Sequence, residues 1–206
     1  SVHGDHMHKK NEFMFSYRRS NMLMSRVKSG KTDMQIDEIM SAPNYASDGS
    51  GTYMNAPTEM KMDMHMFGVM YAPSDSLTLS LMTNYSRKEM TQQRMAMSGS
   101  ERFDVKSSGF GDAKITGLIK IIKNKEIKSH LGIGLSIPTG SIDRRDSTPA
   151  SSDARLGYGM QNSSGTFDPF VFSNNIKDFG RVKVGGQIYL RMPSSGKNAK
   201  GYQYGD

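Results

Sequence analysis

The stretch MKMDMHMFGVMYAP, from Met60 to Pro73, has methionine at every second position over its first half. The residues between these methionines are at first charged or polar, namely Lys61, Asp63 and His65. A period of two is typical of a β-strand, because successive side chains of a strand point to opposite faces of the sheet. The stretch therefore predicts a strand with one apolar face and one face that is charged over half its length.

The same alternation recurs along the rest of the chain. We predict strands at about residues 10–25, 58–72, 75–91, 105–123, 127–138, 166–177 and 180–192. The links at 72–75, 124–126 and 177–180 are short and have turn chemistry. The links at 26–57, 92–104 and 139–165 are long and polar.

This rhythm of short and long links is typical of outer-membrane β-barrels, which have short periplasmic turns and long external loops. The predicted fold is therefore all-β: an antiparallel, up-and-down transmembrane β-barrel of the outer-membrane type. We expect one domain over residues 1–206, with residues 1–9 as an N-terminal segment.

Composition narrows the class further. The 206 residues include no cysteine, which excludes disulfides and thiolate metal sites. Only 35% of the residues are hydrophobic, as expected if only one face of each strand meets lipid. The net charge is +7, but the basic residues are scattered along the chain, so we expect no nucleic-acid partner.

The alternation also suggests which residues would face a lumen. We expect the methionine face of residues 60–70 to meet acyl chains and the charged face to point inward. The candidate lumen residues are Arg18, Lys61, Asp63, His65, Arg181, Lys183 and Arg191. Their basic bias favours the passage of anions or polarisable aromatic solutes.

An alternative interpretation is a copper-handling protein, because thioether and imidazole groups are ligands for copper. The candidate ligands are His3, His6, Met7, His8, Met62 and Met64. Alternate residues of one strand are about 6.6 Å apart along its axis. This distance is too long for two of them to share an ion unless a neighbouring strand supplies further ligands. Met14, Met22 and Met24 of the first strand could supply such a partner. Apart from copper, we expect no cofactor.

Enzymatic motifs are not evident. His65 lies near Asp63 and His130 follows Ser129, but no GxSxG elbow is present and GFGDAK lacks the spacing of a phosphate loop. We therefore expect no enzymatic activity and no catalytic residue. A purely structural barrel with a plugged lumen is a further alternative.

Several blocks of sequence resemble one known family. These are GDHMHKKNEFMFSYR from residue 4, SSGFGD from residue 107, GLSIPTGS from residue 134 and LGYGMQNSSGTFDPF from residue 156. They are similar to bacterial outer-membrane β-barrel transporters named after the MetA pathway of phenol degradation. The resemblance implies a protein of the bacterial outer membrane, surrounded by its lipid, that passes small hydrophobic or aromatic solutes. It implies no catalytic residue.

Members of that family are generally longer. Seven strands do not close in the even-numbered bacterial pattern, whose minimum is eight. We therefore expect a C-terminally incomplete copy of the barrel. The sequence gives no indication of its oligomeric state.

Overall fold

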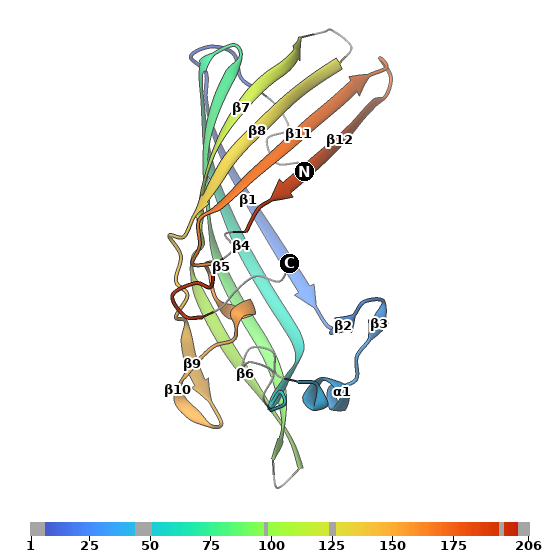
Figure 1. Ribbon diagram of the computed structural model, residues 1–206, viewed down its shortest axis with the longest axis vertical. Helices are drawn as coiled ribbons and strands as arrows, with labels where there is room; N and C mark the ends of the chain where they lie inside the picture. The colour runs from blue at the N-terminus through green and yellow to red at the C-terminus, as the bar shows by residue number, and fades with distance from the viewer. Residues whose placement is uncertain (1–6, 44–50, 97–98, 124–126, 194–195, 202–206) are drawn as a thin grey trace.

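The computed structural model describes residues 7–43, 51–96, 99–123, 127–193 and 196–201. Its main feature is one eight-stranded antiparallel sheet, curled into a half-barrel (Figure 1). The strands are β1 (Phe13–Met24), β4 (Asn55–Ser74), β5 (Leu77–Ala96), β6 (Gly99–Phe110), β7 (Ala113–Lys123), β8 (Ile127–Ile137), β11 (Asp168–Asp178) and β12 (Lys183–Arg191).

The order across the sheet follows the chain: β1, β4, β5, β7, β8, β11 and β12, with β6 also paired to β5. β1 therefore forms one margin of the sheet. The other margin is formed by β12 on one half of the sheet and by β6 beside the second half of β5. Each strand is antiparallel to the strand beside it, as the alternating pattern predicted.

Smaller elements lie in the two long connections. The first contains β2 (Lys28–Ser29), β3 (Thr32–Asp33) and α1 (Ile36–Ser41). The second contains β9 (Arg145–Thr148), β10 (Ser151–Arg155) and the 3-10 turn η2 (Tyr158–Met160). In the part of the chain that the structure describes, no helix is long and apolar enough to cross a membrane.

Two predicted boundaries were wrong. Residues 92–104 are not a polar loop, because β5 and β6 continue as a paired hairpin out to Ala96 and Gly99. The predicted strand 105–123 is interrupted between Phe110 and Ala113. β6 pairs with the second half of β5 and β7 with its first half, so one long strand of the sheet is built from two.

The register divides the side chains between a concave and a convex face. Phe170 and Phe172 are on the concave face and are 1% and 2% exposed. Phe15 and Ile188 are on the convex face and are 78% and 67% exposed. Small polar residues are buried on the concave face, namely Thr78, Ser80, Ser86, Thr116 and Ser136. The concave face thus buries small polar groups together with some aromatic and aliphatic ones, whereas large apolar side chains are exposed on the convex face.

Two glycines of β8 make room for the concave aromatic residues. Gly132 pairs with Phe172 and Gly134 with Phe170. A Cβ at Gly132 would lie 2.2 Å from the Phe172 ring, and a Cβ at Gly134 would lie 2.3 Å from the Phe170 ring and 2.6 Å from the Ile115 carbonyl oxygen. Each ring therefore occupies the space that a side chain on β8 would need.

We expect Gly134→Ala to destabilise the fold by about 1–3 kcal/mol, because the added methyl group overpacks a site bounded by backbone. Urea unfolding followed by far-UV circular dichroism measures this change. Gly186→Ala in β12 is the matched control, since a Cβ there meets nothing within 4 Å. Equal midpoints for the two variants would contradict the proposed role of Gly134.

Candidate functional site

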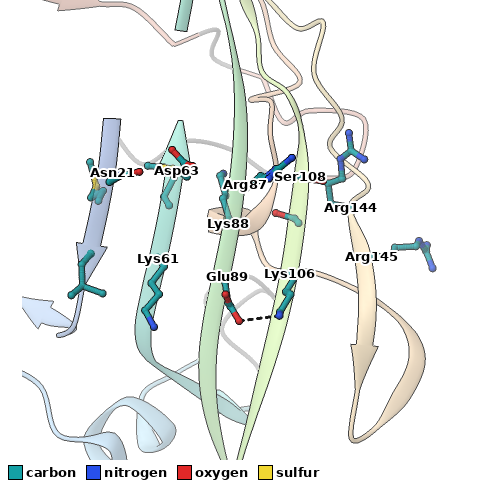
Figure 2. A pocket seen from close by; sticks show the side chains of 14 residues that line it. Asn21, Lys61, Asp63, Arg87, Lys88, Glu89, Lys106, Ser108, Arg144 and Arg145 are labelled. Carbon is teal, nitrogen blue, oxygen red and sulfur yellow. Dashed lines mark ion pairs between the residues drawn. The ribbon is translucent and has the colours of Figure 1, made fainter. Parts of the chain in front are cut away.

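A groove of about 860 Å³ lies where β1, β4, β5 and β6 run side by side and the segment around β9 approaches them (Figure 2). The register places several charged residues that line it on the convex face, namely Lys61, Asp63, Arg87, Glu89 and Lys106. Arg144 and Arg145 line it from the second long connection. We call this the outer groove.

Several charges near the outer groove form ion pairs. Lys106 Nζ lies 3.1 Å from a Glu89 carboxylate oxygen, as Figure 2 marks. Arg19 donates to both carboxylate oxygens of Asp63, at 3.0 and 2.8 Å. Lys61 Nζ lies 3.0 Å from Glu59. Exposed pairs of this kind contribute little stability each. Basic residues outnumber acidic ones in the lining, so the groove is a solvated surface with an excess of positive charge.

The structure reverses the orientation predicted for β4. Lys61, Asp63 and His65 share a face with Phe67 and Val69, which are 42% and 37% exposed on the convex side. The methionines lie on the opposite, concave face. Alternation shows only that two faces differ, and in this twenty-residue strand the charged part extends beyond the apolar part of the same face.

The other predicted lumen residues lie in different places, some on the concave face and one in a turn. Arg18 pairs with Met66, and Arg191 pairs with Phe170, so both belong to the concave face. Lys183 lies at the start of β12, opposite Asp178, and its Nζ is 3.2 Å from that carboxylate. Arg181 lies in the turn between β11 and β12. Only Arg191 lines a described pocket on the concave side.

That concave pocket, the inner pocket, has a volume of about 280 Å³. Its charged lining residues are Lys88, Asp112, Lys114 and Arg191, and Met62 and Met64 line another part. Direct pairing produces a row across four strands: Met82, Lys114, Ser136 and Asp168. At the end of this row Asp168 is fully buried and forms an ion pair with Arg191.

Residues 157–164, the inner segment, pack on the concave face and form one wall of the pocket. Lys88 Nζ donates to the carbonyl oxygens of Gly159 and Gln161, at 2.9 and 2.6 Å. Ser107 Oγ donates to the Met160 carbonyl oxygen at 2.7 Å. Met160 also packs with Val105 and Leu156. The inner segment therefore fills part of the half-barrel.

Sequence reasoning did not select Lys88 or Lys114. The signal for Lys88 was available, because the alternation of SLTLSLMTNYSRKEM places it on the same face as Ser80 and Ser86. Lys114 follows the break at Gly111 and Asp112, so its face could not be read from the preceding residues.

The proposed copper ligands do not come together. The backbone N–H of Asn11 donates to the Ala72 carbonyl oxygen, so the N-terminal segment lies beside the far end of β4. Met62 is ten residues away, about 33 Å along the strand. Met7 instead packs against Leu118, Phe170 and Phe172. His8 Nδ1 lies 3.6 Å from Glu12.

Some sulfur-bearing residues are nevertheless paired. Met22 is opposite Met62, and Met24, Met60 and Met90 are paired across three strands. Met64 has serines at both sides, Ser20 and Ser86. His3 and His6 lie outside the described residues. Among those described, no group of three or more His, Asp or Glu could hold a metal ion.

A second charged cluster joins the long connection to the end of the described chain. Asp143 lies 3.5 Å from Arg145, 3.7 Å from Arg155 and 3.4 Å from Lys200. Burial raises the pKa of the Asp143 carboxyl, but Arg145, Lys200 and Arg155 together outweigh this effect, and its pKa lies below the usual range. The carboxylate therefore stays ionised and holds residue 200 beside β9 and β10.

No protein-family model matches this chain, and a search of curated proteins found no match.

We expect Lys88→Met to release the inner segment, because it removes two charge-assisted hydrogen bonds worth about 1.5–3 kcal/mol each. Hydrogen exchange of the amides of residues 158–161 should accelerate at least about tenfold, measured by mass spectrometry. Lys106→Met is the control, since it removes the same charge from the neighbouring strand on the convex face. An equal acceleration in both variants would show that Lys88 does not hold the segment.

Proposed function

We propose that this chain belongs to a bacterial outer-membrane β-barrel that passes small solutes. The observation that carries the proposal is the polarity of the sheet, with apolar side chains exposed on the convex face and polar side chains buried on the concave face. A soluble β-protein has the reverse need, because its apolar face must pack on a core.

The exposed apolar residues are numerous and lie on adjacent strands. On the convex face they include Phe13, Phe15, Tyr17, Phe67, Val69, Leu79, Leu81, Ile115, Ile119, Ile133, Leu135, Ile188 and Leu190. Contiguous apolar surface of this extent is rare on soluble monomers and marks contact with a membrane or a partner. A band of this kind around the strands is what a lipid-facing barrel wall requires.

The border of the apolar band supports the same assignment. A hydrogen bond of 2.8 Å joins the Tyr17 hydroxyl and His65 Nδ1. The Tyr85 ring packs edge-on against the Phe110 ring, with 5.3 Å between the ring centroids. Beyond these rings the convex face becomes charged, with Asp63 and Arg87 next along the strands. Aromatic rings with a polar tip are typical of the interface between lipid and water.

In lipid, the backbone groups along the β1, β6 and β12 margins need hydrogen-bond partners. Pairing of these margins with further strands is therefore part of the proposal. The sequence resemblance to the phenol-degradation transporters supports the same class of protein. The inner segment narrows the concave side, which favours small solutes over large ones, and the proposal includes no enzymatic step.

The absence of native cysteine allows a direct test of sidedness. Met66 and Phe67 are adjacent and lie on opposite faces. In lipid vesicles, we expect a polar thiol reagent to label Met66→Cys at least about tenfold faster than Phe67→Cys, because lipid covers the convex face. In water the order would be the reverse, since Phe67 is the more exposed residue.

Asp63→Cys is the matched control for this labelling. It lies on the same convex face as Phe67 but beyond the apolar band, so the reagent should reach it. Fast labelling of Phe67→Cys in vesicles would refute insertion. If insertion is found, discrete conductance steps in a planar bilayer test whether the protein forms a conduit.

A copper-binding function is the second candidate, favoured by the pairing of Met24 with Met60 and Met90 and of Met22 with Met62. Thioethers on adjacent strands are suitable ligands for Cu(I). We expect Met62→Leu to weaken Cu(I) binding severalfold in competition with a chromophoric chelator. Met64→Leu is the control, because its paired neighbours are serines. No difference between the two variants would count against this function.

A further inference from the structure

The inner pocket brings together three basic side chains from three different strands. Lys88 comes from β5, Lys114 from β7 and Arg191 from β12. All three are on the concave face. Lys114 pairs with Ser136 and Ser136 pairs with Asp168. Asp168 in turn forms the ion pair with Arg191. The pocket thus concentrates positive charge in a small volume.

The carboxylates of the pocket are already engaged. Asp112 accepts hydrogen bonds from the backbone N–H of Gly140, at 3.3 Å, and from the backbone N–H and hydroxyl of Ser164, at 3.0 and 3.2 Å. Asp168 accepts from the Thr166 hydroxyl, at 2.8 Å, in addition to its ion pair with Arg191. Both acidic groups therefore already have partners within the protein, and of the two Asp112 lines the pocket.

Lys114 has the most incomplete set of contacts. In the part of the chain that the structure describes, no hydrogen bond or ion pair joins its ammonium group to another residue. Met82 and Ser136 flank it in the register. Lys88 uses its ammonium on two carbonyl oxygens, and an ammonium group has three donors. Asp112 lines the same pocket but forms no direct ion pair with Lys114. A partly buried ammonium group without a direct ion-pair partner is unfavourable, and an anion in the pocket would relieve this cost.

One part of the wall offers apolar contact, whereas most of the remaining lining consists of Ser, Asn and Gln side chains. Met62 and Met64 line the pocket opposite the inner segment, and Tyr158 lines it from η2. Methionine side chains are flexible and adapt to flat or branched groups. A volume of about 280 Å³ fits a small molecule and not a polymer or a lipid chain.

We propose that the inner pocket binds a small organic carboxylate, with its anionic end between Lys114, Lys88 and Arg191 and its apolar body against Met62 and Met64. The inference deepens the proposed function, on which it rests for the role of the pocket as a station on the path of the solute. Binding itself requires no conduction.

Isothermal titration of the refolded full chain in detergent micelles tests the site, with benzoate as the probe and benzamide as its neutral isostere. We expect benzoate to bind at least about tenfold more tightly than benzamide, because hydrogen bonds to charged groups are the stronger ones. Lys114→Met should weaken benzoate binding at least about tenfold, whereas Lys114→Arg should retain it within severalfold.

Lys120→Met is the matched control. Lys120 lies on the same strand and face as Lys114, opposite His130, and does not line the inner pocket. Lys120→Met removes the same charge as Lys114→Met. Benzoate affinity should therefore stay within about twofold of the parent if the affinity depends on the residues that line the inner pocket. Circular dichroism of each variant verifies that it has folded.

Three results would overturn the site: equal binding of benzoate and benzamide, unchanged benzoate binding in Lys114→Met, or an equal loss in Lys120→Met. Tighter binding of inorganic phosphate than of benzoate would overturn the carboxylate assignment. Because the titration is made in micelles, a chain that conducts nothing can still bind benzoate. A chain that conducts can equally fail to bind it, so the two proposals fail separately.

Discussion

The antiparallel hydrogen-bond ladder is the constraint on which the rest of the structure depends. Directly paired residues share a face, so fixing the side of one residue fixes the side of all its neighbours across the sheet. Met70 is 7% exposed on the concave face, and Phe15 on the convex face is 78% exposed. Which face of the sheet is buried is therefore a property of the whole ladder and not of any single strand.

Curling the sheet narrows the space on its concave face, and two different kinds of side chain fill that space. The concave side narrows, and near β8 and β11 it is filled by Phe170 and Phe172 packed over glycines. Toward the other end the concave side of β4 carries methionines, whose flexible chains fit against the irregular inner segment. The same strand order thus provides a rigid, aromatic region and an adaptable, methionine-lined region.

The existence and order of the strands could be predicted, because a period of two with turn residues at regular intervals is a local property. The face that each strand turns inward could not be predicted, because the alternation is the same whichever face is turned inward. The prediction for Lys61 and Asp63 was wrong for this reason. The break after Phe110 was missed although the alternation changes phase there. Odd-numbered residues such as Val105 lie on the concave face in β6, and even-numbered residues such as Thr116 lie on it in β7. Lys114 acquires its position only from pairing across β7 and β8.

The inner segment links the shape of the half-barrel to the chemistry of its pocket. Lys88 holds the carbonyl oxygens of Gly159 and Gln161 and also lines the pocket. Asp112 has the same double role, because it binds the backbone N–H groups of Gly140 and Ser164. An anion that attracts the Lys88 ammonium competes with those carbonyl oxygens for its protons. Binding of the proposed anion would therefore be energetically coupled to the position of the inner segment, since both depend on one ammonium group.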